Sequence, residues 1–283
     1  SNFYKGKNVV VAGGSGFIGT HYIKELLKRD ANVTTHTHKR HLQVQDDKIK
    51  IVNNLDLEKL EDCYKLVEGA DYLIHAAGRI CHPASVPTDI EVSIQNIKVT
   101  GNLLEASHKS GVKGFLDLNS STGYPDVRRP LKEEEFWDGE PHSKYFGYGW
   151  MRRYREKLME HVSRFSEMKI ALARGTAIYG PNDNFDLKTC HVVPALIRRA
   201  LSGENPFEVW GSPDVVRDFL NAVLKATGKD PEVYYDSSKP TTIPFRMVST
   251  EKLENELGFK KKYTFEEGIA KTVKWYEESQ KNR

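Results

Sequence analysis

The chain begins with a buried-strand pattern that is followed at once by a helical one. Residues Asn8–Ala12 (NVVVA) form a short β-branched run, which is typical of a buried parallel strand. Three glycines, at 13, 16 and 19, then interrupt the pattern, and apolar side chains recur at helical spacing up to Arg29. Strand, glycine-rich turn and helix in this order predict dinucleotide binding, because glycine lets a pyrophosphate approach the main-chain amides.

The same alternation of short apolar runs and longer amphipathic stretches continues along the chain. Further strands are expected at Asn32–Thr37, Lys50–Val52, Tyr72–Ala76, Gly114–Asn119 and Ile170–Arg174, and helices at Glu58–Glu68, Ile90–Ser110 and Lys144–Phe165. This alternation predicts an α/β fold of the Rossmann type, with a doubly wound parallel sheet. Beyond Gly180 the rhythm breaks. We therefore expect a dinucleotide-binding domain at 1–178 and, mainly, a small C-terminal substrate-binding lobe at 179–283.

Composition narrows the classes of partner. The 283 residues are 39% hydrophobic and 29% charged, which is typical of a globular protein, and no apolar run approaches the ~20 residues that a membrane span needs. A net charge of +3 without a long basic block argues against nucleic-acid binding. Cys63, Cys81 and Cys190 lie far apart and lack metal-ligand spacing. We expect a cytoplasmic protein that uses no metal and binds small anionic ligands.

Four motifs carry a family resemblance: GGSGFIG at 13–19, HAAG at 75–78, SSTGYP at 120–125 and YGWMR at 148–152. They resemble those of extended short-chain dehydrogenases/reductases, the NAD-dependent epimerase/dehydratase family, whose members act on nucleotide-activated sugars. HVVPALIRR at 191–199 and VWGSPDVVRDF at 209–219 are similar to segments of the GDP-L-fucose synthase group within that family. The resemblance covers nearly the whole chain. It implies reduction of a GDP-4-keto-deoxy sugar, with or without epimerisation.

The segment after the second strand bears on the cofactor. A site that prefers NAD usually carries an acidic residue there, whereas this chain has His38, Lys39 and Arg40. Cationic donors suit a 2′-phosphate, so NADP(H) is expected, with NAD as the alternative and a solvated basic loop as the non-functional interpretation. With the positions that the resemblance adds, the expected cofactor-binding residues are Gly13, Ser15, Gly16, Phe17, Ile18, Gly19, His38, Lys39, Arg40, Asp56, Leu57, Ala76, Ala77, Gly78, Tyr148 and Arg152.

The resemblance also implies the catalytic group. In this family a tyrosine hydroxyl exchanges the proton at the carbonyl oxygen, a serine assists it, and a lysine follows the tyrosine by four residues. Tyr148 and Ser120 match the first two positions, but the third is Arg152. Arginine keeps the positive charge, yet it is planar, bulkier and never neutral, so the exchange is not conservative. It is either a natural variation or an introduced change.

A second departure concerns epimerisation. His191 matches a histidine that acts as an acid in this step, but its usual cysteine partner, two residues after the serine, is Thr122 here. A hydroxyl is a far weaker acid than a thiol. Reduction at carbon 4, with or without a preceding epimerisation, is therefore the main expectation, and a plain 4-ketoreductase fits as well. The alternatives are an NAD-dependent nucleotide-sugar dehydrogenase, dehydratase or epimerase, and a non-catalytic nucleotide-binding protein.

The substrate residues come from the same resemblance. Ser120 and Val192 are expected beside the sugar, and Arg199, Trp210 and Arg217 around the GDP moiety, because arginine offers forked donors and tryptophan a flat face. Surface ion pairs and core burial are the structural alternatives. The resemblance further implies a homodimer through Ile90–Ser110 and Lys144–Phe165.

One segment of the family pattern is missing. After Leu220 the family pattern continues for a further stretch of roughly 45 residues. In this chain Asn221 already resembles the end of a later helix. The difference is larger than the shortening of a surface loop would produce. We expect the parent protein to contain that segment.

Overall fold

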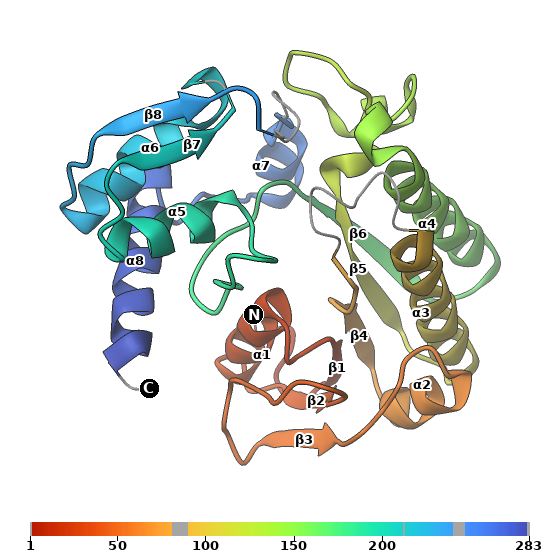
Figure 1. Ribbon diagram of the computed structural model, residues 1–283. Coiled ribbons are helices and arrows are strands. Elements are labelled where there is room, and N and C mark those ends of the chain that lie inside the picture. The colour runs from red at the N-terminus through yellow and green to blue at the C-terminus, as the bar shows by residue number, and fades with distance from the viewer. Residues whose placement is uncertain (1, 81–89, 212, 240–246, 282–283) are drawn as a thin grey trace.

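Six parallel strands form the central sheet of the computed structural model, which describes residues 2–80, 90–211, 213–239 and 247–281 (Figure 1). They are paired in the order β3-β2-β1-β4-β5-β6. Their bounds are β1 Asn8–Ala12, β2 Asn32–His36, β3 Ile49–Val52, β4 Tyr72–His75, β5 Gly114–Ser120 and β6 Lys169–Gly175. The order reverses between β1 and β4, which is where such sheets bind ligands beyond the carboxyl ends of their strands.

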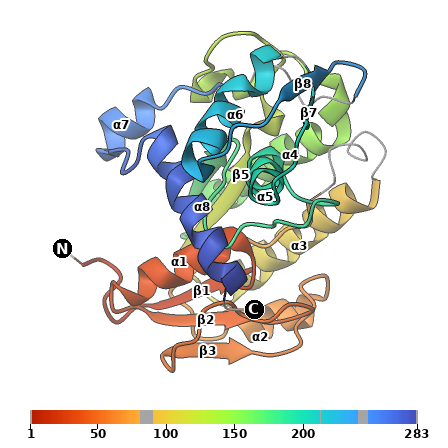
Figure 2. The same cartoon turned by 60° about the vertical axis from the view of Figure 1, so that its left-hand side comes forward.

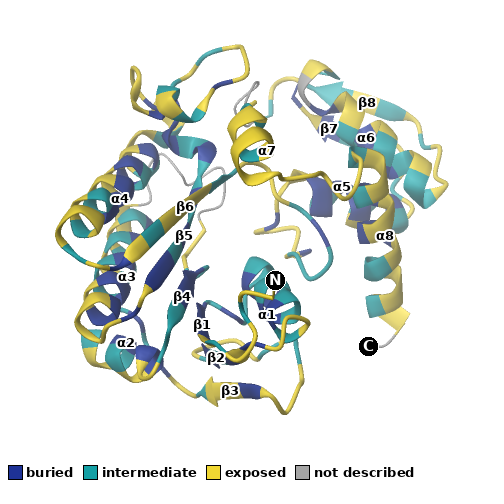
Figure 3. Ribbon diagram, turned by 180° about the vertical axis from the view of Figure 1, so that it is seen from behind, coloured by how far each residue is buried: buried dark blue, intermediate teal, exposed yellow. Residues whose placement is uncertain are grey.

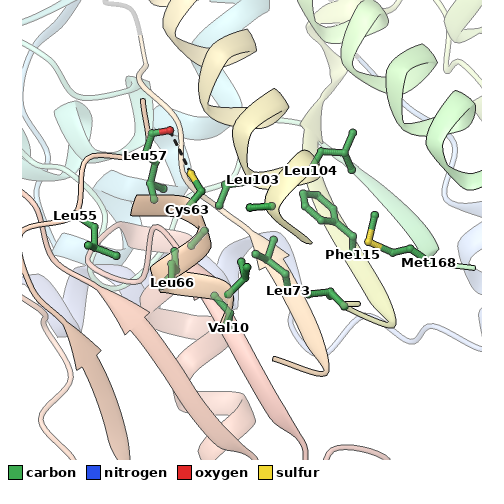
Figure 4. Close-up of a cluster of buried hydrophobic side chains, with 14 of the residues drawn as sticks. Val10, Leu55, Leu57, Cys63, Leu66, Leu73, Leu103, Leu104, Phe115 and Met168 are labelled. Atoms are coloured by element: carbon green, nitrogen blue, oxygen red, sulfur yellow. Dashed lines mark hydrogen bonds between the residues drawn. The ribbon is translucent and has the colours of Figure 1, made fainter. Parts of the chain in front are cut away.

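Helices cover both faces of the sheet, because successive strand side chains point to opposite sides. Val9 and Val11 of β1 pack with α1 (Phe17–Leu27) on one face. Val10 of the same strand packs with α2 (Leu60–Val67) and α3 (Ile90–Lys109) on the other, in a cluster that also takes in α4 (Phe146–Phe165) (Figure 4). The doubly wound Rossmann-type fold is therefore confirmed.

A second buried cluster holds the C-terminal lobe. Its elements are α5 (Val192–Leu201), β7 (Phe207–Trp210), α6 (Pro213–Thr227), β8 (Val233–Asp236), α7 (Glu251–Leu257) and α8 (Phe265–Lys281). β7 and β8 pair in parallel, and α6 packs against both α5 and α8 (Figure 2). Ile197, Phe207, Leu220 and Ile269 lie at the centre of this cluster.

The predicted strands agree with the structure to within one residue at each end. The helix at 144–165 begins two residues later than expected, because Ser143–Tyr145 forms a 3₁₀ turn. Helix α6 runs without a break through Leu220 and Asn221, where the missing family segment is expected. At the far edge of the sheet, β6 pairs only with β5 among the described residues, and most of its side chains are exposed or half-buried (Figure 3).

Candidate active site

The glycine-rich turn lies against the end of β4. Gly13 has φ +87°, and a Cβ there would come within 2.6 Å of the Ala77 nitrogen. A Cβ at Gly19 would lie 2.2 Å from the Gly13 carbonyl oxygen. Only glycine fits at these two positions, and the turn therefore brings main-chain atoms of 13–19 and 76–77 together.

The N-terminus of α1 suits a phosphate group. Its N-cap residue, Gly16, makes no side-chain cap, and the first turn carries no acidic residue. The first amides of a helix lack internal partners and lie at the positive end of its dipole. Ser15, Phe17 and Ile18 flank this end and are partly exposed. These residues fit the pyrophosphate of a dinucleotide.

His36, at the end of β2, points inward to the glycine-rich turn. Its Nε2 accepts a 3.1 Å hydrogen bond from the Gly13 amide. Burial lowers the pKa of His36 to about 4, with a smaller contribution from His38. The imidazole is therefore neutral at pH 7 and acts as an acceptor that holds the turn. The sequence offered no signal for this role.

The basic residues after β2 point outward. His38, Lys39 and Arg40 are all exposed, and none of the three forms an ion pair within the described part of the chain. Asp56 is half-buried and caps its own turn by accepting from the Glu58 amide. Leu57 is only 6% exposed and belongs to the core beside Leu66 and Leu73, so only its main chain remains for an adenine ring (Figure 4).

The loop after β4 is held by Asn96, a buried residue of α3 that the sequence patterns did not single out. Its amide donates to the Arg79 carbonyl, and its Oδ1 accepts from the Arg79 nitrogen, both at 2.9 Å. This clamp holds the loop after Ala76 and Ala77, next to the turn, and Gly78 is exposed there. Among the buried residues of α3, Asn96 is the one with a side-chain amide, and its place four residues after the apolar Val92 was the available signal.

Tyr148 and Arg152 form a pair on the first turns of α4. Nη2 of Arg152 donates a 2.6 Å hydrogen bond to the Tyr148 hydroxyl oxygen, and the guanidinium lies 4.8 Å from the ring centroid. Both side chains are half-buried. A cation bonded to the phenol oxygen stabilises the phenolate, which is what a proton donor to a carbonyl needs.

Ser120 ends β5 next to this helix. Its Oγ accepts from the Thr122 nitrogen at 3.3 Å and from the Thr122 hydroxyl at 3.2 Å. A Cβ at Gly149 would lie 2.7 Å from the Thr122 carbonyl, so the turn after β5 and α4 are in close contact. The predicted Ser120, Thr122, Tyr148 and Arg152 thus belong to two segments packed together.

Two further charged groups tie α4 to the sheet. Glu156 pairs with Arg174 of β6 and accepts a 2.6 Å hydrogen bond from the Asn119 amide. The same amide donates to the Arg152 carbonyl at 3.1 Å. Deeper in, Arg155 donates to the fully buried Asp117. These contacts set the position of the turn that carries Tyr148 and Arg152.

The lobe places the remaining predicted residues on separate elements. His191 is the exposed N-cap of α5, and Val192, which follows it, is 37% exposed. Trp210 is exposed at the end of β7, and Arg217 is exposed on α6. Arg199 instead forms an ion pair with Glu204 and lies over the Phe207 ring. Arg199 thus already has the partner that the structural alternative expected.

The described residues hold neither a metal site nor a membrane span. No group of three or more histidine, cysteine or acidic side chains within 2–80, 90–211, 213–239 and 247–281 is placed to hold a metal ion. No helix in that part of the chain has the length and apolarity to cross a membrane. Cys63 and Cys190 are free and buried, and Cys81 lies outside the described residues.

Comparison with known proteins identifies the family. The profile of the NAD dependent epimerase/dehydratase family matches residues 9–223. This chain belongs to that family, and it is an enzyme with a nicotinamide dinucleotide site.

The chain is similar to curated relatives along nearly its whole length. It is 28% identical over 313 residues to GDP-L-fucose synthase of Sinorhizobium fredii (strain NBRC 101917 / NGR234), covering 94% of each chain. It is 24% identical over 313 residues to GDP-L-colitose synthase of Yersinia pseudotuberculosis, covering 95% of this chain and 97% of that protein.

Solved structures share the fold. UDP-glucose 4-epimerase of Thermotoga maritima, with UDP-glucose, superimposes with a TM-score of 0.85 at 21% identity and covers 96% of this chain and 99% of that one. A GDP-L-fucose synthetase from Naegleria fowleri, bound to NADP, has a TM-score of 0.78 at 19% identity, with coverage of 98% and 96%. UDP-glucose 4-epimerase of Thermus thermophilus, complexed with NAD, has a TM-score of 0.79 at 23% identity, with coverage of 95% and 99%.

Proposed function

We propose that this enzyme reduces the carbonyl at carbon 4 of a GDP-linked 4-keto-deoxy sugar, with NADPH as the hydride donor. The observation that carries the proposal is the hydrogen bond from Arg152 to the Tyr148 hydroxyl, on the helix that packs against the turn after β5. The GDP-L-fucose and GDP-L-colitose synthases among the relatives support the substrate class.

The residues divide the reaction between them. When bound, the cofactor supplies a hydride to the carbonyl carbon. Tyr148 donates its proton to the carbonyl oxygen, and Arg152 stabilises the phenolate that is left. The Ser120 hydroxyl, which already accepts from Thr122, is free to donate its own proton to the developing alkoxide. The glycine-rich turn and the first turn of α1 bind the pyrophosphate, and Lys39 and Arg40 bind the 2′-phosphate of NADPH.

Reduction without epimerisation is the form of the reaction that the site supports. The hydroxyl of Thr122, which stands where the family has a thiol, donates to Ser120. His191 is exposed and has no thiol partner at that position. We propose that Trp210 and Arg217 contact the GDP moiety from the lobe, with Val192 beside the sugar. Arg199 would join them only by exchanging Glu204 for a phosphate.

The domain division and the missing segment complete the proposal. We propose residues 1–178 as the cofactor domain and 179–283 as the substrate lobe. The alignment with the Sinorhizobium relative spans 313 residues, more than the 283 of this chain, so that relative contains residues without a counterpart here. A longer parent protein would carry them after Leu220. An intact mass of 32.3 kDa for the protein from its natural source would contradict this expectation.

The test is NADPH oxidation, followed at 340 nm, with GDP-4-keto-6-deoxy-mannose. The chain, Arg152→Lys and Tyr148→Phe are compared. Turnover by the first two and not by the third supports the reductase. Turnover only by Arg152→Lys identifies this chain as a disabled form. If the original chain and Arg152→Lys both bind NADPH but neither turns over, the proposed substrate is contradicted. That result favours the non-catalytic alternative or another nucleotide sugar. Running the reaction in D₂O detects epimerisation, because it exchanges carbon-bound hydrogen with solvent.

A further inference from the structure

A buried ion pair lies directly behind Tyr148 and Arg152. Arg155 follows Arg152 by three residues on α4, so the two guanidinium groups are neighbours on one face of the helix. Arg155 is 2% exposed and donates to Oδ1 of Asp117, which is fully buried on β5. The charge of Arg152 acts on Asp117, and both Arg152 and Tyr148 act on Arg155. These four side chains form one electrostatic unit.

The other groups that face Asp117 are neutral or already paired. From β4, Nε2 of His75 lies 3.9 Å from Oδ1 of Asp117 and 3.0 Å from the Thr100 hydroxyl. Burial, followed by the charges of Arg155 and Arg152, holds the pKa of His75 well below its usual range, so this ring carries no charge near pH 7. From α4, Glu156 also faces Asp117, but it pairs with Arg174. Burial raises the pKa of Asp117, whereas the charges of Arg155 and Arg152 and the hydrogen bond from Arg155 oppose that rise. With Arg155 bonded to it, Asp117 is the anion that balances one of the two arginines.

A buried ion pair of this kind is weak evidence for a gain in stability. Removing two charges from water costs free energy that a buried pair regains only with full hydrogen bonding. Oδ2 of Asp117, Nε of Arg155 and Nε of Arg152 are all buried without a partner among the described residues. Replacing a buried ion pair by apolar side chains of similar volume is often neutral or stabilising. The cluster instead places charge next to the first turns of α4, where Arg152 bonds the Tyr148 hydroxyl.

We propose that Asp117 is the counter-ion of the Arg152–Arg155 pair, and as such a positioning residue that keeps the Tyr148 hydroxyl protonated until it is needed. The inference rests on the proposed function, in which Tyr148 is the acid. With Asp117 ionised, the charge of Arg155 is balanced and Arg152 alone acts on the phenol. Without the charge of Asp117, Arg155 acts as a second cation that favours the phenolate, and the Tyr148 hydroxyl loses its proton at a lower pH.

The test reads Tyr148 directly and needs no substrate. Tyrosine is labelled with ¹³C at Cζ, and the signal that disappears in Tyr148→Phe identifies the residue. Asp117→Asn is expected to lower the pH midpoint of that signal by about one unit, as a change of one nearby charge does. The control is Asp71→Asn, the same chemical change just before the amino end of β4, where Asp71 pairs with the exposed Lys113. It should leave the midpoint in place.

Arg155→Met should shift the pH midpoint of the Tyr148 signal in the opposite direction. It also provides a second test if Asp117→Asn does not fold. It leaves Asp117 beside Arg152, so the midpoint is expected to rise. The double variant Asp117→Leu/Arg155→Met removes both charges and should return the midpoint to the original value while the protein stays folded. No downward movement in Asp117→Asn, or no upward movement in Arg155→Met, would overturn the inference. The two proposals fail in different ways. Absence of turnover counts against the proposed substrate, whereas midpoints that do not move in the variants count against the counter-ion.

Discussion

The Tyr148 hydroxyl lies 2.6 Å from Nη2 of Arg152, one helical turn further along α4. Four residues is the spacing at which helical side chains meet, and it places the cation on the atom that would exchange the proton. Arg152→Met should therefore lower kcat for reduction by about 100-fold or more, the usual contribution of a positioned acid. Steady-state kinetics at saturating NADPH measure this. Lys157→Met removes an exposed cation from the same helix and should leave kcat near its original value. Unchanged kcat in Arg152→Met would exclude a role for Arg152 in proton transfer.

Acid should destabilise the fold through His36. Its folded pKa is about 4 and its unfolded value about 6.5, so between these pH values the unfolded chain binds more protons. Stability is then lost as the pH falls, by about 2 kcal/mol between pH 7.5 and pH 5 from this residue alone. Protonation would also turn the acceptor of the Gly13 amide into a donor.

Urea unfolding at both pH values, for the chain and for His36→Gln, isolates this effect. Glutamine keeps an acceptor of similar reach but does not titrate. The variant should lose less stability on acidification than the original chain, by about the same 2 kcal/mol. His75 titrates with the same sign in both forms and cancels in the comparison. An equal loss in both would show that His36 does not carry the acid sensitivity.

What the sequence could and could not reveal follows from where the contacts lie. The strands and the glycine-rich turn are local patterns, so β1 through β6 were predicted nearly to the residue. The pairing of Asp117 with Arg155 joins residues 38 positions apart. On its own, the run from Arg152 to Lys157 is indistinguishable from a solvated helix face. Leu57 shows the reverse case: a position assigned to the cofactor by resemblance has its side chain in the core.

The glycine-rich turn should not tolerate a methyl group at position 19. The Cβ of Gly19→Ala would lie 2.2 Å from the Gly13 carbonyl oxygen, so the turn must open. We expect a lower melting temperature and the loss of measurable NADPH binding by fluorescence titration. Gly101→Ala is the matched control, since its Cβ meets nothing within 4 Å. That change in α3 should stabilise the helix by up to about 1 kcal/mol. Full NADPH affinity in Gly19→Ala would contradict the assignment of this turn.

The exposed cations after β2 should decide between the two cofactors. Lys39→Ala combined with Arg40→Ala removes the donors expected at the 2′-phosphate and should raise the Kd for NADPH about tenfold or more. NADH lacks that phosphate, so its Kd should change little. Lys28→Ala with Arg29→Ala removes the same charge from the far end of α1, where both residues pair with Glu25. Unchanged Kd values for both NADPH and NADH would identify the segment as a solvated basic loop, and equal losses for both would contradict a contact with the 2′-phosphate.

An apolar stripe on the outer surface of α3 and α4 should form the homodimer interface. Ile94 and Tyr154 are 59% and 54% exposed there, and Ile90 and Trp150 extend the stripe toward the starts of the two helices. Such residues on two adjacent helices can pack with the same pair of a second copy, because a two-fold interface is self-complementary. Light scattering at micromolar concentration should give twice the chain mass, and Ile94→Glu should give the single mass by burying a charge in the contact. Leu257→Glu, an equally drastic change at an exposed position of α7, should leave the dimer intact. A monomeric mass for the original chain would contradict the dimer. Dissociation of both Ile94→Glu and Leu257→Glu would contradict the assignment of the interface to α3 and α4.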